Sequence, residues 1–182
     1  MLNNNLSALI IGPTDKTKIF RFGKIKKENY ENYKSEIGKV LAKNLSTIYL
    51  IPSEGIPLDF AKAYRQAGGS EVIGVLPKGG HEASEEYFKF CNKIEEIDGD
   101  WSVLNTCLSL KSGLMIGFGL SPGTLVEIAY SKHHKKYLKK DIPIFLDERT
   151  ISQRLNPELE EEVDLTYFSL TSELNSLLKK LK

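Results

Sequence analysis

The chain has 182 residues, of which 41% are hydrophobic and 27% charged, and its formal net charge is +1. This length is typical of one domain with its own core, so we expect residues 1–182 to form a single domain. So small a net charge gives no overall attraction to nucleic acid or to a membrane surface, and we predict neither partner. No apolar run is long enough to span a membrane, and two cysteines are too few for a disulfide framework. These features predict a cytoplasmic protein, and the spacing of its cysteines and histidines predicts no metal site.

Short apolar segments recur along the chain at the spacing of an alternating β/α protein. They are continuous hydrophobic runs, which is typical of strands that are covered on both faces. The five clearest are Ser7–Ile11, Thr47–Ile51, Val72–Leu76, Leu114–Phe118 and Ile142–Leu146. Leu165–Phe168 is a weaker sixth candidate. Phe20 and Phe22, on either side of Arg21, predict either a small edge strand or a loop.

Between these strands, apolar residues recur at helical spacing. The pattern predicts an α/β fold built on one doubly wound parallel sheet, similar to a Rossmann fold. The expected helical segments are Glu28–Lys43, a helix from about Pro57 to Gly68–Gly69, a charged amphipathic stretch Ser84–Ile97, Trp101–Leu110, a helix that begins near Leu125, and Ser172–Lys182 with Ser172 as its N-cap.

In such a sheet, ligands bind beyond the carboxyl ends of the strands. The loops to consider are therefore Gly12–Asp15, Pro52–Pro57, Pro77–His81 and Gly117–Gly123.

The first two of these loops could bind an anion. The loop after the first strand offers Gly12, Pro13 and the hydroxyl of Thr14, although a tight turn explains the same residues. It contains no GxGxxG of a dinucleotide site, and the chain has no phosphate-binding GxxxxGK[ST] loop. The second loop places Ser53 and Gly55 before a helix that starts with proline, where free N–H groups could receive an anion. Ordinary turn chemistry is the alternative there too.

The most informative pattern in the sequence is GFGLSPGTLVE, which leads from a strand into a helix. Gly119 and Gly123 would let a phosphate approach the backbone closely, and Ser121 and Thr124 supply hydroxyls. Two caps compete for the start of this helix. Thr124 with Glu127 matches a capping box, which needs no ligand, whereas Ser121 followed by proline predicts an earlier cap that frees Glu127 for other work. Both alternatives fit the sequence.

The chain resembles the LONELY GUY (LOG) group of the SLOG superfamily, whose members were often labelled "possible lysine decarboxylase". The resemblance rests on DFAKAYRQAGGSEVIGVLP, at residues 59–77, and on PGTLVEIAY, at residues 122–130. Gly123, Thr124 and Glu127 fall on the G, T and E that end the family motif PGGxGTxxE. The resemblance implies a Rossmann-like fold, a homodimer, and a ligand site at this motif.

The chain departs from the family at several positions. Two motif glycines are Leu120 and Ser121 here, and the family's catalytic arginine falls on Leu104, with Asn105 beside it. Lys111 lies two helical turns after Leu104 and could replace the missing cation, or it is an ordinary surface lysine.

In active relatives, the resemblance implies hydrolysis of a nucleoside 5′-monophosphate to a free base and ribose 5-phosphate, with Glu127 orienting or activating water. Because the arginine and two glycines are replaced, the sequence favours binding of a nucleotide or a related phosphorylated small molecule around Gly117–Glu127 without full catalysis. A phosphoribohydrolase is the alternative, and a non-catalytic structural or partner-binding domain is the second alternative.

Overall fold

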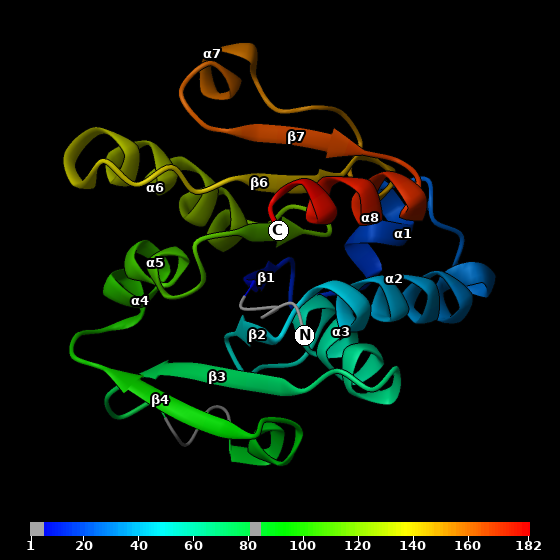
Figure 1. Cartoon of the computed structure of the whole chain (residues 1–182), viewed down its shortest axis with the longest axis horizontal. Helices are drawn as coiled ribbons and strands as arrows, with labels where there is room; N and C mark the ends of the chain where they lie inside the picture. The colour runs from blue at the N-terminus through cyan, green and yellow to red at the C-terminus, as the bar shows by residue number, and fades with distance from the viewer. Residues whose placement is uncertain (1–5, 81–84) are drawn as a thin grey trace.

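The computed structural model describes residues 6–80 and 85–182. Within these residues, seven parallel strands form one sheet in the order β4-β3-β2-β1-β5-β6-β7 (Figure 1). The strands are β1 (Ser7–Ile11), β2 (Thr47–Leu50), β3 (Glu71–Pro77), β4 (Lys93–Ile97), β5 (Met115–Gly117), β6 (Ile144–Asp147) and β7 (Leu165–Phe168). The α/β, doubly wound fold that the sequence predicts is confirmed.

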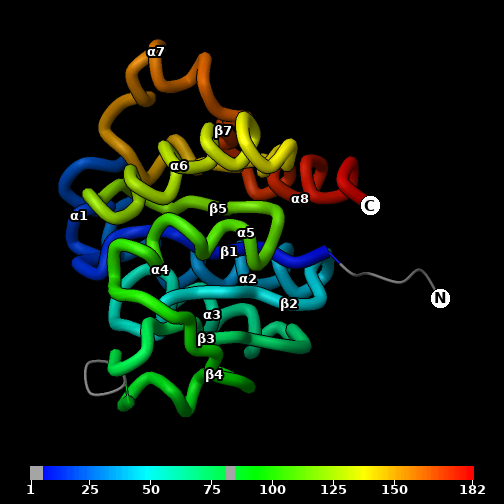
Figure 2. Tube along the Cα trace, turned by 90° about the vertical axis from the view of Figure 1, so that its left-hand side faces the viewer, coloured from blue at the N-terminus to red at the C-terminus, as the bar shows by residue number. Residues whose placement is uncertain are grey.

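Helices cover both faces of this sheet (Figures 1 and 2). On one face α2 packs against α3 and α8, and on the other α6 packs against α4 and α5. The helices are α1 (Thr17–Phe22), α2 (Tyr30–Asn44), α3 (Ile56–Gln66), α4 (Trp101–Cys107), α5 (Ser109–Ser112), α6 (Pro122–Leu138), α7 (Pro157–Glu160) and α8 (Thr171–Lys180), with 3-10 turns at Lys27–Asn29, Glu85–Phe90 and Glu148–Thr150.

The strand order reverses between β1 and β5. From β1 the chain adds β2, β3 and β4 on one side, and then returns to place β5, β6 and β7 on the other. The loops that follow β1 and β5 therefore diverge toward opposite faces of the sheet and leave a crevice between them. This crevice is the expected position of a ligand.

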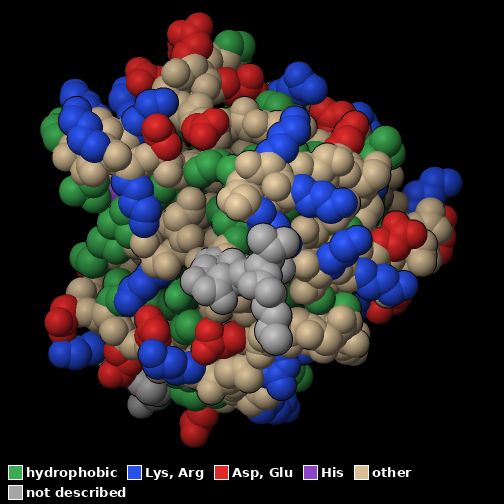
Figure 3. All heavy atoms as spheres, in the orientation of Figure 1, with side chains coloured by type: hydrophobic (Ala, Val, Ile, Leu, Met, Phe, Trp, Pro, Cys, Tyr) green, Lys and Arg blue, Asp and Glu red, His purple; other side chains and the backbone are tan. Residues whose placement is uncertain are grey.

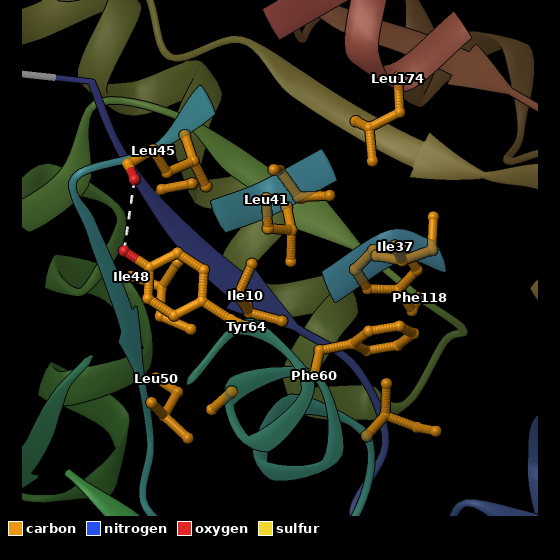
Figure 4. Close-up of a cluster of buried hydrophobic side chains, with 14 of the residues drawn as sticks. Ile10, Ile37, Leu41, Leu45, Ile48, Leu50, Phe60, Tyr64, Phe118 and Leu174 are labelled. Carbon is orange, nitrogen blue, oxygen red and sulfur yellow. Dashed lines mark hydrogen bonds between the residues drawn. The ribbon is translucent and has the colours of Figure 1, made fainter. Parts of the chain in front are cut away.

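A buried aromatic cluster packs α2 and α3 onto the sheet (Figure 4). Phe60 of α3 stacks on Phe118, with ring centroids 3.9 Å apart, and Tyr33 of α2 meets both rings edge-on. The buried Tyr64 hydroxyl donates to the carbonyls of Leu45 and Ser46 and thereby ties α3 to the turn before β2. Burial of this apolar area holds the layers together, and it fixes where the loops beyond the strands begin.

The charged stretch Ser84–Ile97 is not one amphipathic helix, and this expectation is wrong. Ser84 lies outside the described residues, Glu85–Phe90 is a 3-10 turn, and Lys93–Ile97 is the edge strand β4. An edge strand has one free flank and tolerates charged side chains, which obscure the strand pattern. Its Glu95 pairs with Lys93 on the same strand, at 2.7 Å.

The segment around Phe20 and Phe22 is also neither a strand nor a loop. It forms the short helix α1, whose start is held by Asp15, because the Asp15 carboxylate accepts the N–H of Thr17 at 3.0 Å. Ile19, a residue of this helix, is completely buried. A local cap and one buried anchor therefore decide this element.

The last helix begins one residue before the predicted cap. Ser172 lies inside α8, which starts at Thr171. The Glu173 carboxylate reaches back to accept the N–H groups of Ser169 and Leu170, at 2.8 and 3.0 Å. This acidic side chain satisfies two backbone N–H groups ahead of the helix, and Ser172 does not act as the N-cap.

Gly55, the N-cap of α3, lies where the loops after β1 and β2 touch. It adopts φ +100°, and a Cβ at this position would collide with backbone atoms of Pro13 and Thr14. The neighbouring N–H of Ile56 donates to the carbonyl of Pro13 at 3.0 Å. The two loops are thus joined backbone to backbone, which only glycine permits.

We expect Gly55→Ala to lower the free energy of unfolding by more than about 3 kcal/mol, because it adds a backbone collision to an unfavourable φ. Gly68→Ala is the matched control. Gly68 has φ +88°, but no atom lies within 4 Å of the position that a Cβ would occupy, so this variant loses only the backbone contribution, about 1 kcal/mol. Urea unfolding measures both, and equal losses would contradict the close approach at Gly55.

Candidate functional site

A cavity of about 430 Å³ lies at the crevice between β1 and β5. Its walls come from the end of β1 and the loop after it, from the loop after β2, from α1 and α4, and from the start of α6. Such a volume is within the range of small-molecule sites. Seven of the predicted site residues line it: Gly12, Thr14, Ser53, Ser121, Gly123, Thr124 and Glu127.

The other three predicted residues, Pro13, Gly55 and Gly119, do not line this cavity. They lie behind its surface, where the surrounding loops pack against one another. Gly119 has φ +91°, and a Cβ there would lie 2.8 Å from the Ile19 side chain and 3.1 Å from Pro13. Gly55 borders a second cavity of about 480 Å³ on the other side of Thr14. These residues allow the loops to pack closely, so the pattern that suggested ligand binding also serves packing.

Of the four predicted loops, the one after β3 does not line the cavity with its described residues, 77–80. Gly80 closes a turn there by donating its N–H to the carbonyl of Pro77, and His81 lies outside the described residues.

Ser121 caps α6, and this geometry decides between the two caps that the sequence allows. Its Oγ accepts the N–H of Thr124 at 3.2 Å and lies 2.9 Å from the Thr124 hydroxyl. Pro122 occupies the first helical position, where a missing N–H costs nothing. Glu127 is therefore one turn into the helix and takes no part in capping.

Glu127 presents a buried carboxyl to the cavity. The residue is 6% exposed, and within the described ranges no hydrogen bond or ion pair reaches its carboxyl. Burial alone raises the pKa of Glu127 from 4.5 to about 8. The carboxyl is thus largely protonated at neutral pH, and it can either donate a hydrogen bond or exchange a proton there.

Helix α4 presents Asn105 to the cavity and turns Leu104 away from it. Its start is fixed by Asp100, whose carboxylate accepts the N–H groups of Ser102 and Val103 at 2.9 and 3.1 Å. Leu104 is fully buried in the core, whereas Asn105 lines the cavity. The position that the LOG resemblance aligns with a catalytic arginine is therefore buried in the core and does not line the cavity.

Lys18 and Trp101 also line the cavity, and the sequence did not predict either as a site residue. Lys18 lies on α1, a helix that the aromatic pattern did not predict. Trp101 is the first residue of α4 and is 41% exposed. It is the single tryptophan of the sequence, and this rarity was the one feature that could have marked it as a candidate site residue. Lys111, the candidate replacement cation, does not line the cavity and pairs instead with Glu95 at 3.1 Å.

Neither a metal centre nor a membrane span is found in the part of the chain that the structure describes. No three His, Cys, Asp or Glu side chains converge there as metal ligands would. No described helix combines the length and the apolarity needed to cross a bilayer. The polar side-chain groups of the described residues that line the cavity are hydroxyls, one amide, one indole N–H, one ammonium and one carboxyl.

Several solved structures share this fold. The structural-genomics target TM1055 superposes with a TM-score of 0.70 at 16% identity, over 96% of this chain and 99% of that one. The molybdenum cofactor carrier protein of Chlamydomonas reinhardtii gives 0.68 at 20% identity, over 97% and 98%. The molybdenum cofactor binding protein of the bacterium Rippkaea orientalis gives 0.62 at 16% identity, over 97% of each. At these identities the likeness establishes the fold alone.

The sequence comparisons identify the family. No curated protein sequence matches the chain. The model of the SLOG cluster4 family matches residues 6–166, which is most of the chain. Together with the parallel sheet and the glycine-rich turn before α6, this match establishes that the chain belongs to the SLOG cluster4 family.

Proposed function

We propose that the protein binds a nucleotide or a related phosphorylated small molecule in the cavity between β1 and β5, without full LOG-type catalysis. The observation that carries this proposal is the buried, unpaired carboxyl of Glu127, which faces a cavity at the reversal point of the sheet. A polar group taken out of water without a partner costs free energy. A ligand that pairs with the carboxyl would offset this cost.

The other polar groups of the cavity support a phosphorylated ligand with a ring. Ser53, Thr14 and the single ammonium of Lys18 can contact a phosphate. Trp101 and Asn105 lie on α4 and suit a heterocycle, because an indole stacks on a ring and an amide pairs with its edge. The molybdenum cofactor named for two of the structural neighbours is such a phosphorylated heterocycle, so the proposal includes ligands of that class.

Hydrolysis of a nucleoside 5′-monophosphate is the second candidate, and one observation favours it. The pKa of Glu127 is raised to about 8, which suits a group that exchanges protons near neutral pH. Water would attack C1′ of the ribose as the N-glycosidic bond breaks. A protonated Glu127 could donate its proton to the departing base, and the carboxylate so formed could take up the proton that the attacking water loses. The loss of the family arginine at Leu104 argues against this LOG-type reaction.

We also propose that the protein forms a homodimer through α6. Val126, Tyr130, His133 and Tyr137 recur along one exposed face of this helix. The three aromatic rings lie in a row, with His133 5.3 Å from Tyr130 and 6.0 Å from Tyr137 between ring centroids. Hydrophobic side chains gather on the side of the molecule where α4, α5 and α6 lie (Figure 3). Exposed apolar surface of this kind favours a partner.

For ligand binding, we expect AMP, GMP, CMP, UMP or molybdenum cofactor to raise the Tm without release of free base. A ligand at about 100 times its Kd stabilises the fold by about 2.7 kcal/mol, roughly 5–10 °C for a chain of this size. Thermal shift and chromatographic assay for the base are measured on the same samples. Base release that disappears in Glu127→Gln would establish hydrolysis in place of simple binding. No shift with any of these ligands would contradict both functions and leave a structural role.

The raised pKa of Glu127 predicts a pH-dependent stability. Between pH 4.5 and about 8 the folded carboxyl keeps a proton that the unfolded chain releases, so the free energy of unfolding falls as the pH rises through this window. Glu127→Gln removes the titrating group. We expect it to match the wild type near pH 4.5 and to be more stable near pH 8.5, by up to about 5 kcal/mol.

Urea unfolding from pH 4.5 to 9 measures this difference. Glu161→Gln, at an exposed position, is the control for loss of a carboxylate and should follow the wild type. A constant difference between Glu127→Gln and the wild type across this range would refute the assignment of a buried, titrating Glu127.

For the homodimer, we expect the wild type to sediment as a dimer and the double variant Val126→Glu, Tyr130→Glu as a monomer, because charge on this face opposes its burial. Leu181→Glu is the control. Leu181 is also partly exposed, but it follows α8 on the other face of the sheet, so this variant should still dimerise. A monomeric wild type at tens of micromolar in analytical ultracentrifugation would exclude the proposed dimer.

A further inference from the structure

Lys18 is held beside the start of α6 by the packing of α1. The side chain of Ile19 is completely buried and lies against Gly119, in the turn that precedes α6. The end of α1 is fastened on its other side, where the N–H of Lys24 donates to the carbonyl of Arg149 at 2.6 Å. Lys18, next to Ile19, is partly buried and lines the cavity with Ser121, Gly123 and Glu127.

The ammonium of Lys18 has no counter-ion in contact. Among the described residues no carboxylate lies within ion-pair distance of it, whereas its neighbours Lys16 and Arg21 pair with Asp59 at 3.4 Å and with Asp15 at 3.5 Å. Fully buried lysines are almost always paired, whereas a partly buried lysine keeps its ammonium free for solvent or for a ligand. An unpaired ammonium in a cavity wall is a binding group for an anion.

Backbone N–H groups alone would hold a phosphate poorly at this site. At the start of α6, Pro122 has no N–H, and those of Thr124 and Leu125 donate to Ser121. Among the first four residues of α6, all within the described chain, Gly123 alone keeps a free N–H. Two glycines of the LOG motif are replaced here by Leu120 and Ser121, which is consistent with a weak backbone site for phosphate. A site with so few free N–H groups needs a side-chain cation.

We propose that Lys18 binds the phosphate monoester of the ligand. It would supply a positive charge in place of the arginine that the LOG resemblance aligns with Leu104. This inference rests on the proposed function and deepens it, since it assigns the phosphate to the α1 side of the cavity. Lys18 is the one basic side chain among the described residues that line the cavity, and Glu127 is the one acidic side chain. A phosphate placed at Lys18 and Gly123 leaves Trp101 and Asn105 for the ring.

Fluorescence titration tests the proposal, because Trp101 is the single tryptophan of the chain and lines the cavity. AMP, GMP, CMP and UMP, the four matching nucleosides and inorganic phosphate are titrated into the wild type and into Lys18→Met, Lys18→Arg and Lys26→Met. Lys26 is exposed and does not line the cavity. Lys26→Met therefore removes the same positive charge as Lys18→Met without changing the cavity. Circular dichroism confirms that each variant folds.

We expect Lys18→Met to weaken binding of the preferred monophosphate by about 10- to 100-fold and to leave binding of the matching nucleoside unchanged. Lys18→Arg and Lys26→Met should stay within about 3-fold of the wild type, since both keep the cation in the cavity.

Equal monophosphate affinity in Lys18→Met and the wild type would overturn the inference and leave the proposed function standing. A wild type that binds neither monophosphates nor phosphate would overturn both. Parallel losses for nucleoside and monophosphate would show that Lys18 shapes the cavity and does not bind phosphate, which also overturns the inference.

Discussion

Close backbone packing at the reversal point of the sheet is the constraint on which the rest of the site depends. A Cβ at Gly12 would lie 2.8 Å from the carbonyl of Phe118. A Cβ at Gly55 would collide with Thr14, and one at Gly119 would lie against Ile19 and Pro13. The segments after β1, β2 and β5 therefore hold one another in place, and the cavity walls are set before any ligand arrives. Prearranged walls reduce the entropy that binding must overcome. The glycines in this region act mainly through this packing.

The electrostatics of the site follow from the choice of helix cap. Since Ser121 caps α6, Glu127 takes no part in capping and lies one turn into the helix, where it is 6% exposed at the cavity. There the carboxyl lacks a partner and its pKa rises. Helix α1 adds Lys18 to the lining of the same cavity. The cavity thus holds one ammonium and one carboxyl that is neutral over much of the physiological range, an arrangement that favours an anion.

Much of the fold could be predicted from the sequence, because buried parallel strands are continuous apolar runs. The edge strand β4 escaped prediction, since its charged residues are tolerated where the sheet has no further neighbour. Helix α1 escaped because it is short and is stabilised by one local cap and by Ile19 in the core. Lys18 was missed with it, although it lies only six residues from Gly12.

By itself, the sequence determined the α/β class, the buried strands and the turn that carries Gly123, Thr124 and Glu127, because these features depend on local periodicity and turn chemistry. Tertiary structure alone decided which side chains reach the cavity. Leu104 and Asn105 are neighbours on one helix, yet one is buried in the core and the other faces the cavity. Lys18 and Glu127 line the same cavity although more than 100 residues separate them. Such contacts depend on how helices are rotated and stacked on the sheet, and local sequence does not encode that rotation.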